Sequence, residues 1–150
     1  MKSAKSLLGM PVLRDGKQLG RVTQFLLDDH LTEMQGVWLD CGIRGIRFLR
    51  SNEIDLLGEI AVLAHREGKR ARCDEKPFLR RALSGDGSRA GAITDALIDE
   101  RTRHICALEL SRGYIDDLLD GRRRVWHYQA LLSGDVVVEA AGESEGGMDG

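Results

Sequence analysis

The fold is decided by Gly20-Arg21-Val22-Thr23-Gln24-Phe25-Leu26-Leu27-Asp28, a stretch that recurs 71 positions later as Gly91-Ala92-Ile93-Thr94-Asp95-Ala96-Leu97-Ile98-Asp99. At the same shift the two parts of the chain align without a gap over 35 positions. Roughly two identities are expected there from ordinary composition. The alignment instead contains nine, at Leu8, Asp15, Gly16, Gly20, Thr23, Leu26, Asp28, Leu39 and Gly42. The sequence is therefore a tandem duplication of one small unit.

The two copies differ in length after Gly42. The second copy gains a segment at residues 114–121, which predicts a short helical turn closed by Gly121. The alignment then resumes at a shift of 76, which places Gly58 on Gly134 and Val62 on Val138. Each copy is thus expected to end in the same glycine-led apolar strand.

Within a copy, the pattern predicts several short strands separated by glycine turns. Asp15-Gly16 is expected to form a hairpin turn, since glycine adopts positive φ without strain. In residues 35–41 the alternation places Val37, Leu39 and Cys41 on one face of a strand, and Trp38 on the other. Residues 52–58 are expected to form a helical turn. The predicted strands of the first copy are residues 12–13, 19–28, 35–41, 43–49 and 59–63. This pattern favours an all-β protein of two tandem small β-barrels with short helical turns.

Four segments divide the chain. The first barrel is expected at residues 1–65, a charged linker at 66–77, the second barrel at 78–140 and a disordered acidic tail at 141–150. A unit of roughly 65 residues buries only about 60% of its unfolded surface. Packing two such units together relieves this shortage, which gives the duplication a physical reason.

Composition indicates a globular protein, with 42% hydrophobic and 31% charged residues. The net charge is −2, and four acids without a base lie in residues 139–150, so residues 1–138 carry about +2. A body so close to neutral does not by itself favour nucleic acid. The sequence shows neither a membrane-length apolar run nor a signal-peptide pattern, so we expect a cytoplasmic protein with no membrane partner.

The reactive residue types form no recognisable catalytic or metal motif. Three cysteines, Cys41, Cys73 and Cys106, are irregularly spaced, and the four histidines, His30, His65, His104 and His127, are isolated in the sequence. The surface is the expected place for these histidines. We therefore predict no catalytic, cofactor-binding or metal-ligating residues, no cofactor, and no enzymatic activity.

Two further motifs are read as turns. Gly85-Asp86-Gly87-Ser88 superficially matches a phosphate loop, but its counterpart Asp15-Gly16 identifies it as a hairpin turn. The acidic pairs Asp28-Asp29 and Asp99-Glu100 offer too few oxygens for calcium, which takes six to eight. Solvated hairpin tips are the preferred interpretation of both pairs.

Arginine clusters are the strongest candidates for contact with a partner. One lies in residues 65–81, and the other, Arg122-Arg123-Arg124, is followed by Trp126 and Tyr128. Arginines beside aromatic residues suit RNA or an acidic protein, whereas the simpler interpretation is a charged linker and a solvated loop. Trp38 is out of phase with the core face of its strand, which suggests a place between the barrels or in a subunit contact. The candidate contact residues are Arg70, Arg72, Arg122, Arg123, Arg124, Trp38 and Trp126.

The same residues carry a resemblance to a known family. The chain resembles a PRC-barrel domain in Leu8-Gly9-Met10-Pro11-Val12, Asp15-Gly16, Leu19-Gly20-Arg21-Val22, Leu26-Leu27-Asp28, Gly36-Val37-Trp38-Leu39, Ile54, Gly58 and Ile60-Ala61-Val62. The second copy departs from this pattern, since Arg80 and Ala82 replace Gly9 and Pro11.

The resemblance implies a small β-barrel used for docking, without catalytic residues. Family members form half of a bacterial ribosome-maturation factor and part of the H subunit of photosynthetic reaction centres. Others are stand-alone bacterial and archaeal proteins, some linked to sporulation, and this chain is most similar to these.

Two functions from different classes follow. The first is a non-catalytic protein-binding or adaptor module whose protein partner is unidentified. The alternative is an RNA- or ribosome-associated processing or maturation factor that uses the arginine clusters. A homodimer is a further expectation, and a small-molecule regulator has no supporting residues.

Overall fold

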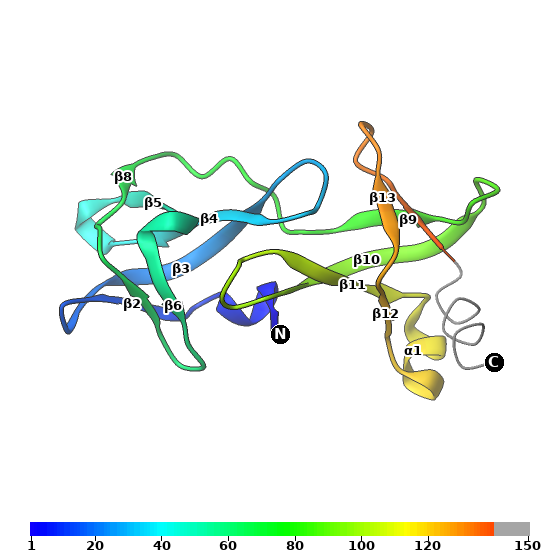
Figure 1. The fold of residues 1–150 in the computed structure, drawn as a ribbon, viewed down its shortest axis with the longest axis horizontal. Helices are drawn as coiled ribbons and strands as arrows, with labels where there is room; N and C mark the ends of the chain where they lie inside the picture. The colour runs from blue at the N-terminus through cyan, green and yellow to red at the C-terminus, as the bar shows by residue number, and fades with distance from the viewer. Residues whose placement is uncertain (140–150) are drawn as a thin grey trace.

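The computed structural model describes residues 1–139, so the tail predicted to be disordered, residues 141–150, lies outside the described residues. The fold is mostly β, with two curled sheets and, in the described part, a single short α-helix. The two sheets lie side by side along the long axis of the molecule (Figure 1). The predicted all-β class with two small barrel-like units is confirmed.

The first sheet contains seven strands in the order β6-β7-β2-β3-β4-β5-β8. Their bounds are β2 Pro11–Arg14, β3 Lys17–Leu27, β4 Met34–Asp40, β5 Ile46–Arg50, β6 Ile54–Leu57, β7 Val62–Ala64 and β8 Lys69–Arg70. Strand β8 extends this sheet into the segment expected to be a linker. Three short 3-10 turns accompany it, η1 Ala4–Leu7, η2 Gly42–Arg44 and η3 Ser51–Glu53.

The second sheet repeats the first six strands of the first sheet, without a counterpart of β8, in the order β13-β14-β9-β10-β11-β12. Its bounds are β9 Arg80–Leu83, β10 Arg89–Ile98, β11 Ile105–Ser111, β12 Arg123–Val125, β13 Tyr128–Ala130 and β14 Val136–Val138. A seventh strand, β1 Lys2–Ser3, comes from the chain start and pairs with β10. Equal strand order, including the parallel β2–β7 and β9–β14 pairs, confirms the duplication.

The structure corrects some local predictions. The helical turn expected at residues 52–58 is mostly strand β6, because Ile54 and Leu57 turn inward and pair with β7. The strand expected from residue 43 begins at Ile46, after the turn η2. The helical insertion is confirmed as α1 Tyr114–Asp120, and Gly121 closes it with φ +74°.

The final strand aligns at a different shift. Val12 pairs with Val62, and its structural counterpart Ala82 pairs with Val136. Val12 lies opposite Gly20 and Ala82 lies opposite Gly91, so in this strand the pairing places Ala82 on Val12, a shift of 70, whereas the sequence alignment placed it on Pro11. Val62 therefore corresponds to Val136, a shift of 74, rather than to Val138. The sequence alignment missed this because valines occupy three consecutive positions there.

Gly20 and Gly91 repeat because the long strands cross their neighbours too closely for a side chain. A Cβ at Gly20 would overlap the carbonyl oxygen of Asp40, and one at Gly91 the carbonyl oxygen of Ser111. Asp40 and Ser111 are themselves 71 positions apart. Only glycine allows the backbones to approach in this way, so the same tight crossing curls both sheets.

The two units exchange their leading segments. Residues at the chain start pack on the second unit, where Asp95 accepts hydrogen bonds from the Ser3 hydroxyl and the Lys5 amide. The counterpart of Lys5 is Lys76, whose carbonyl accepts a hydrogen bond from Gln24 in the first unit. Figure 1 shows the chain start at the centre of the molecule, beside the second sheet.

The exchange produces one continuous hydrophobic core rather than two. Leu7 and its counterpart Phe78 are both buried in it, and the Phe78 ring lies 6.1 Å from that of Phe25. The segment after Asp74 thus repeats the chain start structurally, although it was expected to be linker. No helix in the described part of the chain is long and apolar enough to cross a membrane.

Candidate binding clefts

The units meet where their longest hairpins touch tip to tip. Glu33 and His104, 71 positions apart, face each other as an isolated antiparallel bridge. Two equivalent hydrogen bonds flank them, from the Met34 amide to the Arg103 carbonyl at 2.9 Å and from the Ile105 amide to the Thr32 carbonyl at 2.8 Å. The junction therefore has approximate twofold symmetry, with Glu33 and His104 at its centre.

Aspartates shape both hairpin tips. Asp28 accepts hydrogen bonds from the Thr32 amide at 2.7 Å, the Thr32 hydroxyl at 2.6 Å and the Glu33 amide at 2.8 Å. Burial opposes ionisation of Asp28, but these bonds outweigh it and lower its pKa. Asp99 accepts from the amides of Arg101 and Thr102, which lower its pKa in turn. Both carboxylates are thus occupied in holding backbone, and no described group of acids, histidines or cysteines is arranged to hold a metal.

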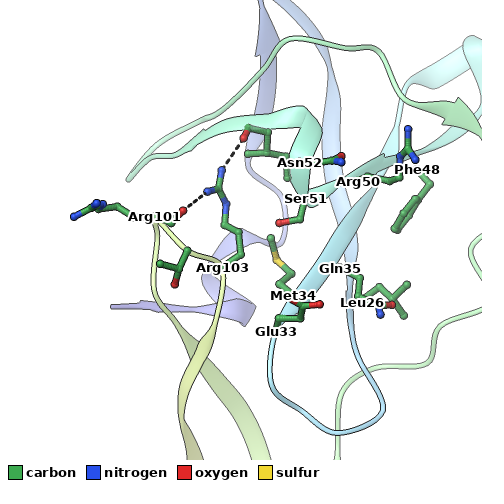
Figure 2. A pocket seen from close by; sticks show the side chains of 12 residues that line it. Leu26, Glu33, Met34, Gln35, Phe48, Arg50, Ser51, Asn52, Arg101 and Arg103 are labelled. Atoms are coloured by element: carbon green, nitrogen blue, oxygen red, sulfur yellow. Dashed lines mark hydrogen bonds between the residues drawn. The ribbon is translucent and has the colours of Figure 1, made fainter.

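One cleft opens on the first-unit side of the junction, with a volume of about 640 Å³. We call it the arginine cleft, because Arg50 comes from β5 while Arg101 and Arg103 come from the opposite hairpin tip. Its apolar lining consists of Leu26, Met34, Phe48 and Ile54. Figure 2 shows Arg101 and Arg50 on opposite sides of the cleft, with Arg103 and Met34 between them.

Arg103 fixes the geometry of this cleft. Its guanidinium donates to the Ile54 carbonyl at 2.7 Å and to the Arg101 carbonyl at 2.8 Å (Figure 2). Burial lowers the pKa of Arg103, an effect that the Asp55 carboxylate opposes. Its backbone has φ +66°, an unusual value for a side chain other than glycine. Arg103 therefore ties the units together, whereas Arg50 and Arg101 are exposed.

A second cleft of about 530 Å³ opens on the second-unit side. We call it the histidine cleft, because His30, His104 and His127 line it. Its other lining residues are Thr32, Glu33, Ile105, Cys106, Trp126, Tyr128 and Glu139. The sequence showed four isolated histidines, and the fold gathers three of them here.

The two clefts are structural equivalents of each other. At the shift of 71, His30 of the histidine cleft occupies the position equivalent to Arg101 of the arginine cleft. Cys106 of the histidine cleft is likewise equivalent to Gln35. Beyond the insertion the ladders give a shift of 76, since Val37 pairs with Leu49 as Leu108 pairs with Val125. Trp126 then stands where Arg50 stands in the first unit. One ancestral site has thus become an arginine-rich cleft on one side and a ring-lined cleft on the other.

The sequence-predicted contact residues do not form one surface. Arg70 lies on edge strand β8 of the first sheet, and Arg72 follows it, exposed and 3.3 Å from the Asp74 carboxylate. Arg123 and Arg124 begin β12, and Arg122 directly precedes it, in the second unit beside α1 (Figure 1). The two basic clusters are therefore separate.

The two tryptophans also differ. Trp38 is 8% exposed, with its ring 4.9 Å from that of Phe48, and it lies within the first unit. Its neighbour across the strand pair, Gln24, is covered by the linker through Lys76. Trp126 is 40% exposed and lines the histidine cleft.

Sequence reasoning missed Arg50, Arg101 and Arg103, and missed that the histidines converge. The feature of the sequence from which these clefts could have been predicted is the duplication. Equivalent hairpin tips in a duplicated protein can meet at a symmetric junction, and the residues around both tips are then neighbours. Neither the families represented by sequence models nor the curated proteins contain a match to this chain.

Proposed function

We propose that the protein is a non-catalytic adaptor whose arginine cleft binds an acidic, partly apolar segment of a partner protein. The observation that supports this is the composition of the cleft. Arg50 and Arg101 come from different repeats and stand on opposite sides of an apolar lining. The site therefore depends on both units being packed together.

Arginine suits this partner chemically. Its planar guanidinium forms paired hydrogen bonds with a carboxylate, and its charge does not depend on pH in the physiological range. Leu26 and Phe48 offer the apolar contact that an acidic segment with interspersed leucine or phenylalanine would fill. The Arg50 guanidinium is 3.5 Å from the Glu53 carboxylate, so a ligand carboxylate would compete with Glu53 for it.

Binding of a fluorescently labelled peptide with alternating glutamate and leucine tests the proposal. We expect binding that weakens with salt and falls about tenfold or more in Arg50→Glu and Arg101→Glu, since each replaces an attractive charge with a repulsive one. Lys17→Glu, on the exposed β2–β3 hairpin, is the charge-matched control. Equal binding by all four proteins would refute the arginine cleft as the site.

The alternative, an RNA-associated factor, is favoured by one observation. In the described structure no carboxylate lies within ion-pair distance of Arg123 or Arg124, whereas Arg122 is paired with Glu109 at 3.2 Å. Two free arginines on an exposed edge strand suit phosphate contact. Retention on single-stranded RNA at low salt, lost in Arg123→Glu/Arg124→Glu, would favour this function over the adaptor.

We also propose that each unit is a PRC-barrel-like domain and that the protein acts in the cytoplasm. The support for the first point is the sequence pattern of glycines and apolar residues. Its test is the solution of a structure of an established family member and comparison of strand order with β6-β7-β2-β3-β4-β5.

A further inference from the structure

We propose that the histidine cleft receives one unstacked base of a single-stranded nucleic acid, with an adjoining phosphate held by Arg124. This inference rests on the alternative function, not on the adaptor, and gives it a specific site. Planar rings dominate the lining of the cleft. They belong to Trp126, Tyr128, His30, His104 and His127.

Rings of this kind are what an unstacked base requires. Single-stranded nucleic acids bind proteins by stacking bases on tryptophan, tyrosine, phenylalanine or histidine. Trp126 is 40% exposed and lines the cleft, so part of its surface is open to a ligand. In the arginine cleft the equivalent position is Arg50, and no aromatic ring except Phe48 lines that site. The ring lining is therefore specific to the second unit.

The acidic residues in the cleft argue for a base rather than a phosphate or an acidic peptide. Glu33 and Glu139 both line it. Their carboxylates repel other carboxylates and phosphates, but they accept hydrogen bonds from the amino groups on base edges, as carboxylates do with cytosine. Glu33 lies at the junction and lines both clefts, so Glu139 is the acid that distinguishes the histidine cleft and disfavours an acidic segment there.

The phosphate contact lies next to this site along the chain. In strand β12 Val125 is buried and Arg124 is exposed on the opposite side of the backbone, and Trp126 follows the strand directly. A base on Trp126 would thus bring its phosphates toward Arg124. Arg123 is exposed as well, but alternation places it on the Val125 side of the strand, so Arg124 is the phosphate contact of this site.

Arg122 is excluded from this role by its own contacts. Its guanidinium lies 3.2 Å from the Glu109 carboxylate and 3.7 Å from that of Asp117, which joins the helix α1 to the sheet. The arginine run therefore divides into one residue with a structural contact and two that are free among the described residues.

Fluorescence gives a direct test, because Trp126 is one of only two tryptophans and Trp38 is buried. In Trp38→Phe the signal comes from Trp126 alone; should that variant fold poorly, the wild type serves with an added aqueous quencher. The probes are an eight-nucleotide uridine RNA, its DNA counterpart, an abasic oligomer of equal length and a polyglutamate peptide. We expect both base-bearing oligomers to quench Trp126, and the abasic oligomer to bind at least about tenfold more weakly without quenching.

Variants separate the base pocket from the phosphate contact. Trp126→Ala should weaken oligomer binding about tenfold or more, and Trp126→Phe should retain most of it because a ring remains. Arg124→Gln should weaken all base-bearing oligomers alike and reduce the slope of log affinity against log salt by about 0.7. Lys17→Gln, with the same charge change on the β2–β3 hairpin, should alter neither.

Several results would overturn the inference. Equal binding of the abasic oligomer, or binding without Trp126 quenching, would leave the RNA function standing but remove the base pocket. Quenching by polyglutamate at a comparable concentration would reassign the cleft to an acidic protein. Failure of every oligomer to bind at low salt would remove the pocket and the RNA function together, and would leave the adaptor proposal untouched.

Discussion

Gln24 and Asp95 occupy equivalent positions in the two repeats, and they are the buried polar side chains of the described structure. Each holds the incoming segment of the other repeat in place. Asp95 accepts the Lys5 amide at 3.1 Å, and Gln24 donates to the Lys76 carbonyl at 3.3 Å. The same position thus performs one task with opposite hydrogen-bonding roles.

Replacing Asp95 should loosen the chain start. Asp95→Ala removes the acceptor for the Ser3 hydroxyl and the amides of Lys5 and Ala96. Ala96 is buried and Ser3 is partly buried, and an unpaired buried donor costs about 1–3 kcal/mol of unfolding free energy. Urea unfolding and hydrogen exchange at the Lys5 amide measure the effect. Asp29→Ala, an exposed acid without a described hydrogen bond, is the control, and equal stability of the two variants would contradict the role of Asp95.

Gly20→Ala should destabilise the first sheet. Its new Cβ would overlap the Asp40 carbonyl, and the strands would have to separate. We expect a loss of about 1–3 kcal/mol, as for other overpacked sites, and a lower melting temperature. Gly85→Ala is matched to it, because Gly85 has ordinary φ and open space around its Cβ position. A melting temperature for Gly20→Ala equal to that of Gly85→Ala would show that the crossing is not tight.

Ionisation of Asp28 should make the free energy of unfolding depend on pH in the acidic range. Its pKa is lowered from 3.8, so the ionised form contributes stability above that value, and the contribution disappears as the pH falls through the folded pKa. In Asp28→Asn the loss of stability between pH 5 and pH 2 should therefore be shallower than in the wild type. Urea midpoints across this range measure the slope. An unchanged slope in Asp28→Asn would contradict the assignment, with Asp29→Asn as the neighbouring control.

The Tyr128 hydroxyl should lose its proton at a higher pH than an ordinary tyrosine. Burial, followed by the charge of Asp28 and then Cys106, raises its pKa to about 12. Its hydroxyl donates to the Leu31 carbonyl at 2.7 Å across the junction. Because the neutral form is favoured in the folded protein, this stability is complete below pH 10 and is lost as the pH rises through about 12.

Ultraviolet absorbance of the tyrosinate, compared between wild type and Tyr128→Phe, measures this titration. The difference between the two curves should have its midpoint near pH 12, provided that the protein remains folded by circular dichroism. Tyr128→Phe should also lose about 1 kcal/mol of unfolding free energy near neutral pH, since the Leu31 carbonyl loses its partner. A midpoint near pH 10 would show that the hydroxyl is open to water.

Much of the fold was predictable from local pattern. The turn at Asp15-Gly16 is determined by its glycine, and the strands on either side of it by the alternation of apolar and polar residues. Both signals act over a few residues. The strand β6 was missed because its run of apolar residues is compatible with either a helical turn or a strand, and only pairing with β7 decides between them. Tertiary contact settled what the local sequence left open.

The clefts were harder to predict for the same reason. Arg50 and Arg101 are about a third of the chain apart in sequence, and nothing in either neighbourhood marks a site. They come together because the hairpin tips meet at Glu33 and His104, a contact that depends on how two units pack. The clusters visible in sequence, by contrast, are close only along the chain.

The symmetric junction has an evolutionary consequence. If a single repeat assembled with a second copy in this arrangement, its leading segment would be swapped between subunits, and both clefts would be built from the same codons. Any substitution that improved one cleft would then appear in the other. Fusion into one chain removes that coupling, so that Arg50 and Trp126 could come to occupy the same structural position. The duplication thus allows one scaffold to present two different ligand chemistries.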